Sequence, residues 1–118
     1  ARRVTSVATR SERAEARPVG RASRVSGALY LGVMDRTIIH VMRHGEVENP
    51  NGVLYGRLPG FGLTELGHQM AARAAQYLVD SGADIARVIS SPLLRAQLTA
   101  APTAAAYGLS IASDPRLI

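Results

Sequence analysis

Two short clusters of arginine, histidine and serine side chains could carry out phosphate chemistry in this chain. The first is Arg43-His44-Gly45, and the second is Ser90-Ser91 with Arg95 a few residues further on. The planar guanidinium group of arginine binds phosphate oxygens in a bidentate way, and a neutral imidazole can act as a nucleophile. Together these residue types indicate a site that holds a phosphoryl group beside a histidine.

An alternation of strands and helices must bring these clusters together. Residues 37–42 form a β-branched, nearly continuous apolar run, which predicts a buried parallel strand, and residues 85–90 predict a second strand. A weaker third strand is expected at residues 109–112, followed by Asp114-Pro115-Arg116. The resulting β-loop-α-β-α-β order predicts an α/β fold with a parallel sheet and right-handed crossovers. In such sheets ligands bind beyond the carboxyl ends of the strands, where both clusters lie.

Two helices are predicted between these strands. Thr64 is a good N-cap, and apolar residues repeat at helical spacing until Gly82 ends the first helix. Ser91 followed by Pro92 predicts the start of a second helix, whose first backbone N–H groups would face a phosphate. Pro102 removes a backbone donor, so we expect a kink or an interruption in this helix.

The motifs on these elements resemble those of a known family. Residues 37–46, TIIHVMRHGE, look like the strand and R-H-G-E motif of the histidine phosphatases, in the phosphoglycerate-mutase-like superfamily. Residues 63–67 are similar to their L-T-x-x-G helix start, and residues 90–100 to their S-S-P-L-x-R-A-x-x-T-A motif. The resemblance covers residues 37–118. It implies a three-layer α/β/α fold with a mostly parallel sheet, present in this chain as an incomplete domain.

The resemblance also implies a role for each site residue. His44 is the nucleophile whose ring nitrogen attacks phosphorus, and Arg43 and Arg95 bind the phosphoryl oxygens. We expect a hydrogen bond at the other ring nitrogen to orient the imidazole, and water to hydrolyse the phosphohistidine. Catalysis of this kind depends on positioning and charge stabilisation, so no metal ion and no other cofactor is expected.

Asn49 and Arg57 are candidates for substrate binding in the long polar loop before the first helix. The length of this loop favours a functional role. The family usually places an asparagine six residues after the nucleophile, whereas Asn49 and Asn51 follow His44 by five and seven residues. For Arg57 the residues leave two interpretations open, a contact with the substrate or a solvated loop arginine.

The resemblance favours a phosphomonoester phosphatase and leaves two alternatives open. One is a 2,3-bisphosphoglycerate-dependent phosphoglycerate mutase, in which the phosphoryl group returns to the substrate; the other is a non-catalytic phosphate-binding module. The mutases typically carry a Gly-Trp-x-Asp stretch before the first helix, whereas residues 56–62 of this chain contain no tryptophan. The family's catalytic glutamate and second histidine are expected beyond Ile118, so these 118 residues alone are expected to be inactive.

The amino-terminal segment differs in charge from the rest of the chain. Residues 1–36 hold eight arginines and three acidic residues, a net charge of +5, whereas residues 37–118 hold six of each. Because it lacks sustained apolar periodicity, we predict a disordered Arg-rich leader at residues 1–33 and the amino-terminal part of the phosphatase domain at residues 34–118. The domain is electrically balanced, so no nucleic-acid partner is expected.

The composition excludes further classes of site. The chain has no cysteine, which removes disulfides, thiolate zinc sites and thiol nucleophiles and fits a reducing compartment. No apolar run approaches the roughly 20 residues that a membrane-spanning helix needs. We therefore expect a cytoplasmic protein that acts on a small phosphorylated substrate and has no membrane partner.

Overall fold

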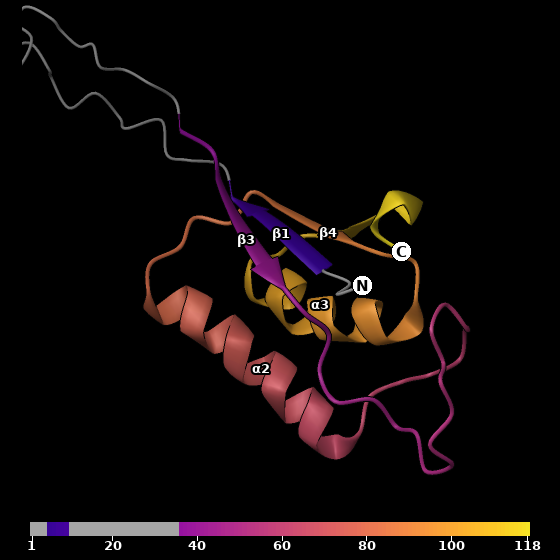
Figure 1. Cartoon of the computed structure of the whole chain (residues 1–118). Helices are drawn as coiled ribbons and strands as arrows, with labels where there is room; N and C mark the ends of the chain where they lie inside the picture. Colours follow the sequence, from indigo (N-terminus) through magenta and orange to yellow (C-terminus); the bar gives the residue numbers. More distant parts are fainter. Residues whose placement is uncertain (1–4, 10–35) are drawn as a thin grey trace, which may run out of the picture.

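The computed structural model describes residues 5–9 and 36–118, in which two helices pack against a four-stranded sheet (Figure 1). The elements follow in the order β1 (Thr5–Thr9), β3 (Ile38–Met42), α2 (Glu65–Asp80), β4 (Arg87–Ser90), α3 (Leu94–Ala106), β5 (Ile111–Ser113) and the 3-10 helix η1 (Pro115–Leu117). Helix α3 contacts β1, β4 and β5, and α2 packs beside α3. Neither α2 nor α3 is long and apolar enough to cross a membrane.

The sheet is mixed, with the strand order β3-β1-β4-β5. β1 is antiparallel to both of its neighbours, and β4 and β5 are parallel. It follows that β3, β4 and β5 all run in the same direction, as the sequence predicts, and that their carboxyl ends share one edge of the sheet. The described residues form one layer of helices on the sheet, so the three-layer arrangement stays a prediction.

β1 departs from the expectation for the amino-terminal segment. No strand is predicted in residues 1–33, yet Thr5–Thr9 lies between β3 and β4. Threonine and valine fit a pleated sheet well, but a five-residue segment is too short to show a periodic pattern. The remaining residues of the predicted leader lie outside the described residues, and the domain boundary at residues 33 and 34 stays a prediction.

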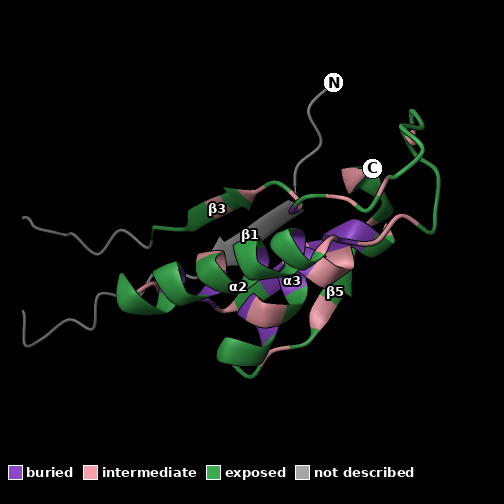
Figure 2. Ribbon diagram, turned by 90° about the horizontal axis from the view of Figure 1, so that it is seen from below, coloured by how far each residue is buried: buried purple, intermediate pink, exposed green. Residues whose placement is uncertain are grey.

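β3 lies at an edge of the described sheet; Ile38, Ile39 and Val41 are exposed, whereas Met42 is half-buried against the core (Figure 2). Ile39 and Val41 are each 62% exposed, so the prediction of a buried strand is wrong for these residues. The run is nearly continuously apolar, with His40 inside it, but its strand neighbour is β1 and the helices pack mainly against β4, β5 and each other, so they leave most of β3 uncovered.

Helix α2 confirms the predicted helix and both of its end signals. The Thr64 hydroxyl oxygen accepts a hydrogen bond from the Gly67 N–H at 3.0 Å. After the last turn, Gly82 has a φ of +72°, in the left-handed region that glycine adopts without steric cost. The loop that carries the predicted nucleophile therefore leads into a helix whose start is well defined.

Helix α3 differs from the prediction at its start and at its proline. It begins at Leu94, two residues after the predicted first position, because the Ser91 hydroxyl oxygen accepts from the Leu93 N–H at 3.3 Å and closes a turn before the helix. The helix continues through Pro102, so of the two predicted outcomes the interruption is wrong and the kink stays a prediction. Tertiary packing supplies most of the stability of a helix in a protein, and the buried side of α3 outweighs one lost backbone hydrogen bond.

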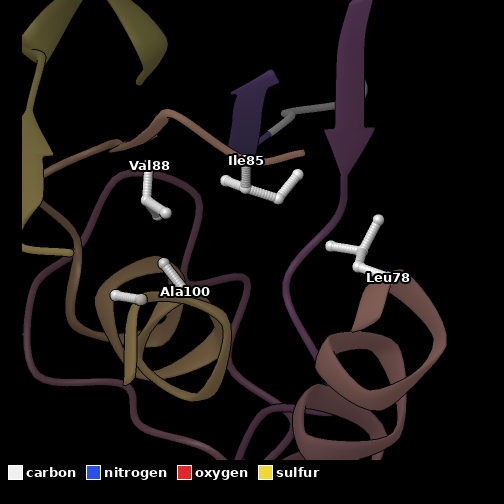
Figure 3. Packing of buried hydrophobic residues seen from close by; sticks show 5 residues of the cluster. Leu78, Ile85, Val88 and Ala100 are labelled. Atoms are coloured by element: carbon white, nitrogen blue, oxygen red, sulfur yellow. The ribbon is translucent and has the colours of Figure 1, made fainter. Parts of the chain in front are cut away.

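The core lies between the helices and β4 (Figure 3). Its buried cluster consists of Leu78, Ile85, Val88, Ala100 and Ala104. Because the α3 residues in this cluster are alanines, the helix can approach the sheet closely. This packing fixes the start of α3 near the carboxyl end of β4.

Candidate active site

His44 lies in the loop that leaves β3, and a local hydrogen bond orients its ring. Nδ1 lies 2.8 Å from the carbonyl oxygen of Gly45. Because a carbonyl oxygen can only accept, we assign the ring proton to Nδ1, and Nε2 of the neutral imidazole keeps its lone pair. The hydrogen bond expected at one ring nitrogen is therefore present, and Nε2 is the nitrogen that can act as a nucleophile.

Gly45 and Gly67 bring this loop against the start of α2. A Cβ atom on Gly45 would lie 2.5 Å from the carbonyl oxygen of Gly67, and one on Gly67 would lie closer still to the carbonyl oxygen of Glu46. That Glu46 oxygen also accepts a hydrogen bond from the Thr64 N–H at 3.0 Å. The R-H-G-E and L-T-x-x-G motifs thus meet in space, and the close approach of their backbones explains the glycine in each.

Thr99 joins the same loop to α3. Its hydroxyl oxygen accepts a hydrogen bond from the Gly45 N–H at 3.0 Å, and the hydroxyl donates to the carbonyl oxygen of Arg95 at 2.7 Å. The side chain is 1% exposed. In the sequence, Thr99 belongs to a family motif but has no predicted role. Its position one helical turn after Arg95 was the one sign that it lies on the same face of α3.

An open pocket of about 500 Å³ lies at this loop. Its lining residues are Arg43, His44, Gly45, Glu46, Val47, Asn49, Tyr55 and Met70. The structure thus brings together three of the predicted site residues, namely Arg43, His44 and Asn49. A guanidinium group beside an imidazole with a free ring nitrogen can bind a phosphoryl group and present a nucleophile to it.

Asn49 lines the pocket while its amide also shapes the loop. Nδ2 donates to the Val53 carbonyl oxygen at 2.9 Å, and Oδ1 accepts from the Val53 N–H at 3.0 Å. One amide proton and one oxygen lone pair remain beyond these two bonds. Asn49 can therefore fix the turn and contact a substrate at the same time.

Arg95 is not among the residues that line this pocket. Its side chain is 2% exposed; Nη2 donates to the Gly56 carbonyl oxygen at 2.6 Å and Nη1 to that of Leu58 at 3.3 Å. The guanidinium carbon also lies 4.7 Å from the centroid of the Tyr55 ring. Arg95 thus contacts the loop, and its predicted contact with a phosphoryl group stays a prediction. A buried guanidinium requires acceptors for its protons, and the loop carbonyls supply them.

The other predicted charged groups lie outside the pocket. Arg57 is exposed on the loop. After β5, Arg116 and Asp114 form an ion pair at 2.6 Å. Hydrogen bonds from the Arg116 side chain and backbone lower the pKa of Asp114 to about 2, so this strand end uses its charges locally. Within residues 5–9 and 36–118, no group of three or more His, Asp or Glu side chains could hold a metal ion.

Comparison with known proteins agrees with these motifs. Residues 39–118 match the family model of the histidine phosphatase superfamily (branch 1). The chain is 56% identical over 84 residues to the uncharacterized protein Rv0525 of Mycobacterium tuberculosis H37Rv, a match that covers 71% of the chain and 41% of that protein. It is 38% identical over 82 residues to the bifunctional protein Rv2228c of the same strain, covering 70% of the chain and 22% of that protein. The chain thus spans less than half the length of these relatives.

Proposed function

Because the chain belongs to the histidine phosphatase superfamily, whose members are phosphatases or mutases, we propose that it acts as a phosphomonoester phosphatase through a phosphohistidine on His44. The observation that carries this proposal is the hydrogen bond between Nδ1 of His44 and the carbonyl oxygen of Gly45. It leaves Nε2 as the nucleophilic nitrogen of a ring that shares a pocket with Arg43.

The reaction proceeds in two displacements at phosphorus. Nε2 of His44 forms a bond to phosphorus while the ester P–O bond breaks, and the departing oxygen takes a proton from the acidic residue expected beyond Ile118. The ring becomes positively charged in this step, and the Gly45 carbonyl oxygen on Nδ1–H stabilises that charge. Water then attacks phosphorus and gives a proton back to the same acidic residue, the N–P bond breaks to leave a neutral imidazole, and inorganic phosphate leaves.

The two arginines contribute differently in this proposal. Arg43 lines the pocket and binds the phosphoryl oxygens, whose charge grows as the ester bond breaks. Arg95 holds the loop through the carbonyl groups of Gly56 and Leu58. A direct contact between Arg95 and the phosphoryl group, as the sequence motif predicts, stays a prediction; the two bonds to these carbonyls use two of the five N–H groups of the guanidinium.

Phosphoenzyme labelling of the full-length protein tests the nucleophile. We expect incubation with a labelled phosphomonoester to give an acid-labile phosphoenzyme that is absent in His44→Ala. His68→Ala is the matched control, because His68 is an exposed residue of α2 that does not line the pocket. Labelling retained in His44→Ala, or lost in His68→Ala alone, contradicts the proposal. A mutase would form the same phosphoenzyme. The fate of the label distinguishes the two enzymes, because a phosphatase passes it to water and a mutase returns it to a substrate.

A further inference from the structure

Tyr55 lies in the wall of the pocket that contains His44. It is half-buried, whereas every other residue from 51 to 60 is exposed. The turn that follows it is closed by a hydrogen bond of 2.6 Å from the Leu58 N–H to the Tyr55 carbonyl oxygen. A loop segment with few buried contacts of its own opens easily, so the orientation of this ring depends on contacts from outside the turn.

Arg95 contacts both this turn and the ring from α3. Its guanidinium donates to the carbonyl oxygens of Gly56 at 2.6 Å and of Leu58 at 3.3 Å. Its Cζ atom lies 4.7 Å from the centroid of the Tyr55 ring. The attraction between a cation and an aromatic face grows when water is excluded, and Arg95 is only 2% exposed. One buried guanidinium therefore fixes both the backbone of the turn and the ring that the turn carries.

Phe61 packs on the same ring from the end of the loop. The two ring centroids are 5.2 Å apart at an interplanar angle of 31°, a separation at which aromatic pairs attract each other. Phe61 is half-buried and is not among the described residues that line the pocket. Its contact with Tyr55 thus supports the pocket wall from behind.

The same turn of α3 also holds the loop of His44. The Thr99 hydroxyl donates to the Arg95 carbonyl oxygen and accepts from the Gly45 N–H. Arg95 and Thr99, one helical turn apart, therefore attach two parts of the pocket wall to one helix. The position of the Tyr55 ring relative to the His44 imidazole is set by this helix.

We propose that Tyr55 is a substrate-contacting residue, and that Arg95 and Phe61 are positioning residues that act through its ring. This inference rests on the proposed phosphatase function and adds a residue to its site. A ring that is held in place before binding loses little ordering entropy when a substrate contacts it. Because such a contact is made in the ground state as well as in the transition state, its loss raises KM more than it lowers kcat.

Steady-state kinetics of full-length variants with phenyl phosphate test the contact. We expect Tyr55→Leu to raise KM about three- to tenfold with a smaller change in kcat, and Tyr55→Phe, which keeps the ring, to restore most of the loss. Phe61→Leu should raise KM in the same direction from outside the pocket. Tyr77→Leu is the matched control, because Tyr77 is 69% exposed on α2 and does not line the pocket.

The outcomes of these variants separate the parts of the proposal. Equal KM values in Tyr55→Leu and Tyr77→Leu, or equal losses in Tyr55→Leu and Tyr55→Phe, overturn the contact through the ring. An unchanged KM in Phe61→Leu overturns the positioning role of Phe61. A parent protein that forms a His44 phosphoenzyme while Tyr55→Leu keeps its KM refutes this inference alone. A parent protein that forms no such phosphoenzyme refutes the proposed function itself.

A double-mutant cycle tests positioning by Arg95. If the guanidinium holds the ring, Tyr55→Leu costs little in a protein that already lacks it, so its effect on KM should fall to less than about twofold in the Arg95→Ala background. Arg95→Lys, which keeps a charge but not the planar fork, is the second background if Arg95→Ala does not fold, and the same fall is expected there. Arg57→Ala is the matched background, because Arg57 is exposed in the same turn, and there the full effect should persist. An undiminished effect of Tyr55→Leu without the Arg95 guanidinium overturns the positioning role.

Discussion

Replacement of Thr99 by valine tests whether α3 holds the loop of His44, the proposed nucleophile. In the structure the Thr99 hydroxyl accepts from the Gly45 N–H, next to His44, and donates to the Arg95 carbonyl oxygen. Valine has nearly the same shape and helix propensity as threonine. The substitution therefore removes one hydroxyl group and leaves a buried N–H of the loop without its partner.

The matched control is Thr103→Val, one turn later on the same helix. Thr103 is 0% exposed, as Thr99 is 1% exposed, but among the described residues its hydroxyl oxygen has no hydrogen-bond partner. A buried donor left unpaired costs about 1–3 kcal/mol, so Thr99→Val should lower the free energy of unfolding by roughly that amount. Removal of an unpaired buried hydroxyl relieves a desolvation cost, so Thr103→Val should be neutral or stabilising by up to about 1 kcal/mol.

Urea unfolding and steady-state kinetics on the two full-length variants provide the assay. We expect a gap of about 1–4 kcal/mol between their free energies of unfolding, the sum of the loss at Thr99 and the gain at Thr103. Kinetically, Thr99→Val should lose about 10- to 100-fold in kcat, because a small displacement of a positioned nucleophile is costly. Thr103→Val should keep the kcat of the parent protein. Equal stability and equal kcat in both variants would refute the role of the Thr99 bond.

Three further outcomes follow from the same geometry. Gly67→Ala gains about 1 kcal/mol of helix propensity but places a Cβ atom against the backbone of the nucleophile loop, so we expect a net loss of stability and of activity. Gly62→Ala is the control, because its Cβ would make ordinary contacts with leucine side chains. Its free energy of unfolding in urea should stay within about 0.5 kcal/mol of the parent value. Equal unfolding curves for the two alanine variants would argue against the close approach of Gly67 to the loop. Truncation that removes Thr5–Thr9 should lower the midpoint of thermal unfolding relative to truncation just before Thr5, since β1 pairs with two strands. An unchanged midpoint would show that these pairings contribute little to stability. In steady-state kinetics, Arg95→Ala should reduce kcat by more than about tenfold, because the loop loses the guanidinium that holds it. Arg57→Ala, at an exposed position, should change KM by a few-fold at most. A larger loss of kcat in Arg57→Ala than in Arg95→Ala would show that Arg57 is the more important arginine.

The helices were predictable because their end signals are local. Thr64 caps α2 through a hydrogen bond to a residue three positions away, and Gly82 ends it through its own backbone conformation. The start of α3 was less predictable, because a serine before a proline can cap a helix or close a turn before it. Ser91 does the second, and the residues alone do not distinguish the two uses.

The order of the strands could not be predicted from the sequence. Consecutive strands of a β-α-β unit are expected to be neighbours, but β1 lies between β3 and β4. Its pairing with both depends on contacts between segments more than 25 residues apart in the chain, and local sequence patterns contain no information on such contacts. The exposure of β3 could not be predicted for the same reason, since an apolar strand has the same sequence pattern at an edge as at the centre.

In the candidate site, residue types predict some of the structural features and leave others undetermined. The motif residues Arg43 and His44 do lie in one pocket, since they are adjacent in the chain. The hydrogen bonds that position this loop come from the Thr64 N–H at the start of α2 and from the Thr99 hydroxyl on α3, and these partners meet only in the folded chain. Arg95 is the clearest case. The family motif predicts that its guanidinium binds phosphoryl oxygens, whereas in the structure the guanidinium is buried and donates to two backbone carbonyl oxygens of the loop. A guanidinium can donate to carbonyl oxygens as well as to phosphoryl oxygens, so its partner depends on which oxygen the fold brings within reach.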